Sequence, residues 1–144
     1  MRVFPGISVV TLGVRSVERA TIFYESLGWR LSRRSSRPAV SYFHMNNMVL
    51  ELRPSDALAR RVGIPDDPGE FGLVVLGQHY GGADSVAHAL ERARAAGGQI
   101  VTPIRSLRTG TVQGSFADPD NHVWNIVFNP QHLPGHDGSL SLAP

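Results

Sequence analysis

Two apolar runs flank a short polar segment in the stretch Thr111-Val112-Gln113-Gly114-Ser115-Phe116-Ala117-Asp118-Pro119-Asp120-Asn121-His122-Val123-Trp124-Asn125-Ile126-Val127-Phe128-Asn129-Pro130. Pro119 has a fixed φ angle and disfavours helical backbone at the preceding Asp118. Asp120 and Asn121 tolerate the left-handed backbone of a tight turn. The stretch therefore predicts a β-hairpin whose turn lies at residues 118–122.

The first half of the chain shows one helical pattern among several extended ones. After Ser16, apolar residues recur at the spacing of one helical face, and Gly28 stands where a helix would end. Asn46 and Asn47 are typical of a two-residue turn between strands. The predicted helix covers residues 16–28, and the predicted strands cover residues 7–14, 29–35, 39–45 and 48–53. This half therefore has the order β-α-β-β-β.

The same order recurs after a connector at residues 55–70, which has room for one short helical turn. Ser85 is the predicted N-cap of the second helix, and Gly97 and Gly98 mark its end. The predicted strands cover residues 71–78, 99–103, 111–117 and 123–130. Ser16, Val17, Ala20 and Gly28 match Ser85, Val86, Ala89 and Gly97 at one offset, and Leu50-Glu51-Leu52 aligns with Trp124-Asn125-Ile126.

These patterns predict an α+β fold made of two βαβββ modules. The modules cover about residues 5–54 and 71–130 of a single domain at residues 1–130, and residues 131–144 form a C-terminal tail.

Composition narrows the classes of function. The 144 residues carry 14 basic side chains, all of them arginine, against 12 acidic ones, so the net charge of +2 gives no indication of nucleic-acid binding. The absence of cysteine excludes disulfides and thiolate chemistry. No apolar stretch approaches the length of a membrane span, and no export pattern is present, so we expect a cytoplasmic protein that does not bind membranes.

Three motifs resemble those of the vicinal oxygen chelate superfamily, which contains glyoxalases, bleomycin-resistance proteins and ring-cleaving dioxygenases. They are Val14-Arg15-Ser16-Val17-Glu18-Arg19-Ala20 with Phe23-Tyr24 and Leu27-Gly28, then Ala95-Ala96-Gly97-Gly98, then Phe116-Ala117-Asp118-Pro119-Asp120. Asn121 replaces the usual glycine of the last motif. The resemblance covers nearly all of residues 7–130. It implies that each module curls into a half-open mixed sheet, that the modules surround a cleft, and that the protein is a homodimer.

The resemblance also indicates where a divalent metal would be held in this superfamily. Its ligand positions fall here on Val9, on Glu51, on Gly72 or Leu73, and on Asn125. Glu51 is a good oxygen ligand and Asn125 a weak one, whereas a catalytic metal needs about three protein ligands. We therefore expect a degenerate site without a metal cofactor. A displaced divalent-metal site that uses His44 or His122 is the alternative, although a histidine at the end of a hairpin is more often simply exposed.

Strand alternation indicates which side chains share the open face of each sheet. Leu50 and Leu52 alternate with Glu51 and Arg53, and Trp124 alternates with Asn125. The bulky faces should pack against the helices, which leaves Glu51, Arg53 and Asn125 on the other side. Glu51 and Arg53 are close enough to pair, either as a purely structural salt bridge or as part of a ligand site.

Three other sets of residues could serve either the structure or the function of the protein. The basic run Arg30, Arg33, Arg34 and Arg37 either holds an anion or protects an edge strand by its charge. Trp29 either stacks on a planar ligand or packs in the core. The segment Tyr80-Gly81-Gly82 lacks the spacing of a phosphate-binding loop.

Three hypotheses about function follow. The first is a protein that binds a small organic molecule, aromatic or antibiotic-like, through Glu51, Arg53, Asn125, Gln113 and Ser115. The second is a lyase, isomerase or dioxygenase with a displaced metal site, or with Glu51 as a catalytic general base. The third is a module that binds only other proteins.

Overall fold

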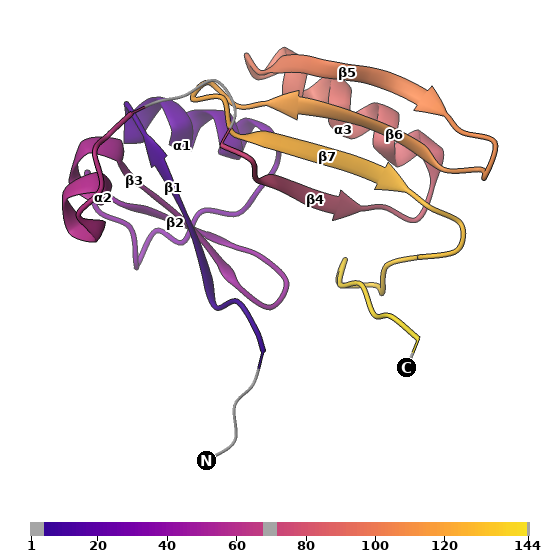
Figure 1. Ribbon diagram of the computed structural model, residues 1–144, viewed down its shortest axis with the longest axis horizontal. Coiled ribbons are helices and arrows are strands. Elements are labelled where there is room, and N and C mark those ends of the chain that lie inside the picture. Colours follow the sequence, from indigo (N-terminus) through magenta and orange to yellow (C-terminus); the bar gives the residue numbers. More distant parts are fainter. Residues whose placement is uncertain (1–4, 68–71, 144) are drawn as a thin grey trace.

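The helices and strands of the protein form two layered modules that lie side by side (Figure 1). The computed structural model describes residues 5–67 and 72–143. Along the chain the elements are β1 (Val9–Val14), α1 (Val17–Ser26), β2 (Ser41–His44), β3 (Val49–Pro54), α2 (Ser55–Val62), β4 (Val75–His79), α3 (Ala83–Ala95), β5 (Gln99–Ser106), β6 (Val112–Ala117) and β7 (Val123–Phe128).

Each module contains one mixed sheet. The first sheet has the order β1-β3-β2 and the second the order β4-β7-β6-β5. In both sheets the first strand pairs in parallel with the last strand of its module, β1 with β3 and β4 with β7. The α+β class and the repeated order are therefore confirmed, except that the first module lacks one strand.

The hairpin at the end of the second module is confirmed in detail. Strands β6 and β7 pair antiparallel, and the amide of Asn121 donates to the Asp118 carbonyl at 3.0 Å. Asp118 Oδ1 accepts hydrogen bonds from the amides of Asp120 and His122, each at 2.9 Å. Asn121 has a φ of 67°, a left-handed backbone that asparagine adopts more readily than most residues other than glycine.

The strand predicted at residues 29–35 is wrong. Only Leu31 makes an isolated bridge, to Phe43, and the segment turns instead of extending. The Ser36 hydroxyl donates to the Ser32 carbonyl at 2.6 Å and accepts from the Tyr42 amide at 3.0 Å. Backbone bonds to β2 form only around Leu31, from the Ser32 amide to the Tyr42 carbonyl at 2.7 Å and from the His44 amide to the Arg30 carbonyl at 2.9 Å. Beyond Ser32 the local side-chain bonds replace the ladder that a longer strand would need.

Other boundaries also differ from the sequence expectation. Helix α3 begins at Ala83, with the extended Gly82 as its N-cap, so Ser85 lies inside the first turn. The connector forms α2, a complete helix that ends at Gly63 with a φ of 75°. Strand β4 begins only at Val75. The expected start of that strand at Phe71 and residues 68–70 of the connector lie outside the described residues.

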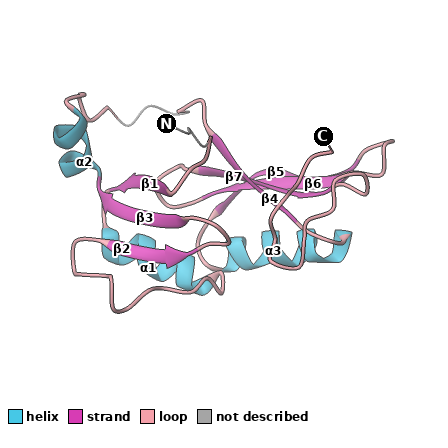
Figure 2. Cartoon of the chain, turned by 90° about the horizontal axis from the view of Figure 1, so that it is seen from below, coloured by secondary structure: helices cyan, strands magenta, loops and turns pink. Residues whose placement is uncertain are grey.

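Helices α1 and α3 cover the same side of their respective sheets (Figure 2). Ser16 caps α1 as expected, since its hydroxyl accepts from the Arg19 amide at 3.1 Å. Both helices stop at a glycine in left-handed backbone, Gly28 with a φ of 90° and Gly97 with a φ of 100°. Among the described residues, no helix has the length and apolar character of a bilayer span.

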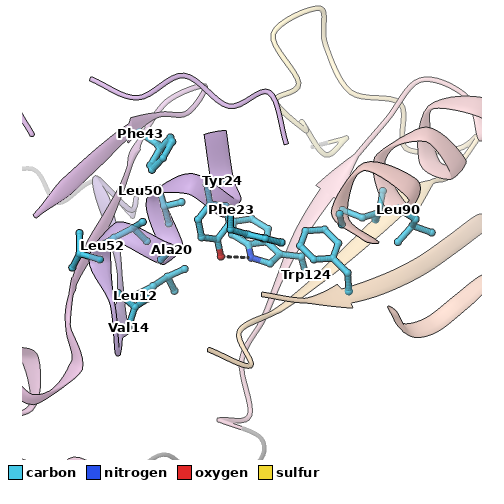
Figure 3. Packing of buried hydrophobic residues seen from close by; sticks show 14 of the residues in the cluster. Leu12, Val14, Ala20, Phe23, Tyr24, Phe43, Leu50, Leu52, Leu90 and Trp124 are labelled. Carbon is cyan, nitrogen blue, oxygen red and sulfur yellow. Dashed lines mark hydrogen bonds between the residues drawn. The ribbon is translucent and has the colours of Figure 1, made fainter. Parts of the chain in front are cut away.

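One aromatic cluster joins the two modules (Figure 3). Trp124 of β7 is 3% exposed, and its Nε1 donates to the Tyr24 hydroxyl of α1 at 3.1 Å. Trp29 stacks on Tyr24 with 5.0 Å between ring centroids and meets Trp124 edge to face at 4.9 Å. Trp124 therefore lies in the core as alternation predicted, and it packs against the other module.

The turn of the β6–β7 hairpin also binds the first module, and we call these contacts the hairpin latch. The Tyr24 hydroxyl donates to Asp118 Oδ2 at 2.6 Å, and His122 Nε2 donates to the Gly13 carbonyl at 2.8 Å. Asp120 Oδ1 accepts from the Arg15 amide at 2.9 Å and from Arg19 at 3.0 Å. His122 is therefore a half-buried structural contact rather than an exposed side chain at a hairpin end.

Candidate functional site

Glu51 lies at the centre of the open face of the first sheet. It is paired across the strands with Thr11 of β1 and Tyr42 of β2, so these three side chains form one row. Glu51 is 6% exposed, and its Oε1 accepts from the Thr11 hydroxyl at 2.8 Å. Arg53 Nε lies 3.0 Å from the same oxygen as an ion pair, though without the alignment of a good hydrogen bond. The predicted Glu51–Arg53 pair therefore forms.

The surroundings of Glu51 do not suit a general base. Burial raises the pKa of its carboxyl, but the polar contacts with Arg53, Tyr42 and Thr11, together with the charge of Arg53, outweigh burial and bring this pKa below its ordinary value. A general base working near neutral pH needs a raised pKa. Glu51 is therefore held ionised by its neighbours, and its lone pairs are directed at donors within the sheet.

The remaining predicted site residues lie on the second sheet. Asn125 is paired with Gly77 on one side and with Ser115 on the other, and Gln113 is paired with Val127 in the next row of the same face. Gln113, Ser115 and Asn125 are thus brought together. Glu51 and Arg53 belong to the first sheet, and none of the five residues lines either of the two cavities described below.

Strand register fixes which residue of β4 corresponds to Val9. Val9 is paired with Val49, two residues before Glu51, and Val75 is paired with Val123, two residues before Asn125. Val75 is therefore the equivalent of Val9, and the assignment to Gly72 or Leu73 is wrong because both residues precede β4. Val75 cannot bind a metal either, since a valine side chain has no lone pair.

The donor set at these positions does not fit the divalent metal of the superfamily. Two valines and an asparagine accompany Glu51, which already accepts a hydrogen bond from Thr11 and forms an ion pair with Arg53. Over residues 5–67 and 72–143, no three His, Cys, Asp or Glu side chains come together as a metal site would require.

A groove of about 900 Å³ lies between the modules, and we call it the inter-module groove. Its apolar lining includes Trp29, Met45, Met48, Leu76, Tyr80 and Trp124, and its polar lining includes Arg30, His44, Gln78 and His79. Residues of the C-terminal tail from Pro134 to Leu140 also line it. The groove follows β4 and the β2–β3 turn, and none of the five predicted site residues lines it.

Residue patterns in the sequence do not indicate most of the groove. His79 and Tyr80 stand at the end of β4, where strand alternation places His79 on the open face. That position could have been noticed, because side chains at the carboxyl end of a strand often line ligand sites. His44, expected to be either exposed or a ligand of a displaced metal, is exposed and lines the groove, and Trp29 belongs to both the core and the groove.

Comparisons with known proteins agree with this architecture. The model of the Glyoxalase/Bleomycin resistance protein/Dioxygenase superfamily matches residues 6–126. The structure of a glyoxalase-related enzyme from Fulvimarina pelagi is 33% identical in sequence, with a TM-score of 0.88, and the alignment covers 98% of this chain and 100% of that chain. No match to a curated protein was found.

Two more distant structures share the fold alone. A glyoxalase/bleomycin resistance protein/dioxygenase from Nocardioides is 22% identical, with a TM-score of 0.72 and coverage of 94% of this chain and 91% of that chain. A lactoylglutathione lyase from Agrobacterium tumefaciens is 15% identical, with a TM-score of 0.64 and coverage of 88% and 96%. The family match over most of the sequence, together with the repeated modules, shows that this chain belongs to the glyoxalase/bleomycin resistance protein/dioxygenase superfamily.

Proposed function

We propose that the protein binds a small organic molecule, aromatic in part, in the inter-module groove. The observation that carries this proposal is the groove itself, with its volume of about 900 Å³ and its lining of aromatic and methionine side chains. Small-molecule sites typically have volumes of about 300–1,000 Å³ and an apolar lining with a few polar groups. Trp29 and Tyr80 offer flat surfaces for a ring, and Met45 and Met48 adapt to irregular shapes.

Polar side chains at the groove would orient the ligand. Arg30 and His44 are exposed at its lining, and Gln78 Oε1 accepts a hydrogen bond from the Tyr80 hydroxyl at 3.2 Å. The ligand-binding role expected of Glu51, Arg53, Asn125, Gln113 and Ser115 passes in this proposal to the groove residues. Glu51 and Arg53 then stabilise the first sheet.

The proposal includes binding without a metal, because the superfamily's ligand positions hold Val9, Val75 and Asn125 beside an engaged Glu51. An enzyme with a displaced divalent-metal site is the second candidate. Its support is that His44, His79 and His136 all line the same groove, although these three side chains do not come together as the ligands of one metal in this structure. Titration with nickel, zinc, manganese and ferrous iron under calorimetry separates the two: stoichiometric binding that is lost in His79→Ala would favour the enzyme.

A fluorescence titration tests ligand binding directly. The chain has two tryptophans and both line the groove, so an aromatic or antibiotic-like ligand should change the intrinsic emission. Candidate ligands would first be selected by thermal shift, because a ligand that binds only the folded state raises the unfolding temperature.

Matched glycine variants make this test specific. A Cβ added at Gly77, on β4 in the groove, would have only the Asn125 carbonyl oxygen within 4 Å, at 4.0 Å. The Gly77→Leu variant should therefore fold, and its leucine side chain should fill part of the groove. The affinity for the ligand should fall about tenfold or more, because the leucine occupies the ligand's space. Gly72→Leu is the control, because Gly72 has open space around it and does not line the groove. Equal affinity in both variants would overturn the groove as the site.

We also propose that the protein is a homodimer, as the superfamily resemblance implies. The open faces of both sheets carry exposed valines, Val9 at 46% and Val75 at 47%, which a second copy would cover. Light scattering coupled to size exclusion gives the mass in solution, and a monomer at micromolar concentration would contradict the proposal.

A further inference from the structure

A second, smaller cavity of about 350 Å³ lies on the helix side of β4, and we call it the α3 pocket. Its floor is apolar and aromatic, formed by Leu27, Trp29, Tyr80 and Phe116. Trp29, Gln78 and Tyr80 also line the inter-module groove, so these side chains form a shared wall between the two cavities. None of the residues discussed for the superfamily's metal belongs to this pocket.

The opposite wall of the α3 pocket is a charged stripe on one helix. Asp84, His88 and Arg92 are spaced four residues apart on α3, so they lie on one helical face. All three are exposed. Asp84 and Arg92 are separated by roughly 12 Å along the helix axis, at 1.5 Å per residue. The pocket thus has a negative end and a positive end.

Arg92 is held over the pocket without an acidic partner. Among the described residues no carboxylate lies within ion-pair distance of its guanidinium, whereas Arg94, two residues away, pairs with Glu91. A Cβ added at Gly28 would lie 2.9 Å from Arg92 Nη2, so the guanidinium rests against the backbone that follows α1. Burial raises the pKa of the Tyr80 phenol in the pocket floor, and the positive charge of Arg92 opposes this shift. The guanidinium therefore already lies beside the aromatic floor before any ligand binds.

We propose that the α3 pocket binds a small aromatic carboxylate. The ring packs against Trp29 and Tyr80, and the carboxylate accepts hydrogen bonds from Arg92, whose planar fork matches a carboxylate in two-point contact. His88 lines the pocket between the two charged ends and offers a further donor. Asp84 repels the anionic group, which fixes the orientation of the ligand with its carboxylate towards the C-terminal end of α3. The small volume limits the ligand to a compact ring system.

The test is a ¹⁹F NMR titration with 4-fluorobenzoate and its neutral analogue 4-fluorobenzamide. Saturable binding of 4-fluorobenzoate is expected, with 4-fluorobenzamide about tenfold weaker, because a hydrogen bond to a charged group is worth roughly that factor or more. Arg92→Gln should lower the affinity for 4-fluorobenzoate about tenfold. Arg92→Lys should lower it less, since lysine keeps the charge but loses the two-point contact. Arg94→Gln is the matched control and should bind as the unmodified protein does.

A second pair of variants keeps the test decisive if Arg92→Gln folds poorly. Ser85→Trp would fill the exposed side of the α3 pocket and abolish binding, whereas Ala87→Trp, on the same helix but outside the pocket, would not. Three results would overturn the proposal: no binding of 4-fluorobenzoate, equal affinity in Arg92→Gln and Arg94→Gln, or loss of binding in Arg30→Gln or Gly77→Leu alone. The last result would place the anion in the inter-module groove.

Discussion

The two modules have the same frame and different open faces. In each, a first strand pairs in parallel with the last, and a helix that ends at a left-handed glycine covers the sheet. The central row of the first open face holds Thr11, Glu51 and Tyr42, whereas the corresponding row of the second holds Gly77, Asn125 and Ser115. A buried ion pair in one module is therefore replaced by neutral groups in the other.

This difference shows which face of each strand the fold constrains. Leu50 and Leu52 correspond to Trp124 and Ile126, and all four are buried against the helices at 3% exposure or less. Packing decides those positions, because a void or a clash in a core costs stability directly. The open faces carry no such requirement, so they are free to differ in charge and chemistry.

The largest expected effect compares equivalent core positions. Trp124→Ala should lose about 3–5 kcal/mol of unfolding free energy, the usual cost of removing a buried aromatic side chain. Leu50→Ala should lose less, because leucine is the smaller side chain and Trp124 also contacts the aromatic rings of Tyr24 and Trp29 in the first module. Urea denaturation measures both. Equal losses would mean that the contact between modules adds nothing to stability.

A smaller effect compares the open faces. Glu51→Ala should destabilise the fold by about 1–3 kcal/mol, because Arg53 and Thr11 lose their partner. Asn125→Ala, at the equivalent place, should change stability by no more than about 0.5 kcal/mol. The double variant Glu51→Ala/Arg53→Ala should recover part of the loss, since it leaves no orphaned charge. An unaltered unfolding curve for Glu51→Ala would show that the pair is not structural.

The two helix ends offer a finer comparison. Replacing either glycine by alanine places a side chain in left-handed backbone at a cost of about 1–2 kcal/mol. Gly28→Ala should cost more than Gly97→Ala, because a Cβ at Gly28 would meet Arg92 whereas a Cβ at Gly97 has open space. Thermal unfolding of both variants checks the order. The reverse order would mean that Arg92 does not rest on Gly28 in solution.

The smallest effect is a dependence on pH that should belong to the first module. Because the pKa of Glu51 is lower in the folded protein than in the unfolded chain, its stabilisation is complete above the unfolded value and is lost as pH falls through the folded value. The stability gap between the unmodified protein and Glu51→Gln should therefore narrow as pH falls from about 7 to about 3. Urea curves at both pH values measure the gap, and a constant gap would contradict the prediction.

Local chemistry made much of the fold predictable. The turn at residues 118–122 requires the proline, aspartates and asparagine that stand there, and Ser16 and Gly28 mark the ends of α1 by their capping chemistry. Strand alternation placed Trp124 in the core and Glu51 beside Arg53. Each of these features depends on residues that are neighbours in sequence.

The features that could not be predicted depend on partners distant in sequence or on competing local hydrogen bonds. Residues 29–35 have an extended pattern, but the Ser36 hydroxyl bonds nearby backbone instead. The inter-module groove joins β4, the β2–β3 turn and the C-terminal tail, which no periodicity connects. The five predicted site residues come from two sheets, as the superfamily resemblance implied, and their role in ligand binding stays a prediction.

The hairpin latch has a consequence for how the chain acquires its structure during synthesis. The contact between His122 and Gly13 spans 109 residues, and the contact between Asp120 and Arg15 spans 105. The first module leaves the ribosome long before these partners exist, so the end of β1 stays without its last hydrogen bonds until β7 has been made. Contacts of such long range slow folding, because a large loop must close before they form. The nascent first module is therefore the stage at which this protein is most open to chaperones and to proteases.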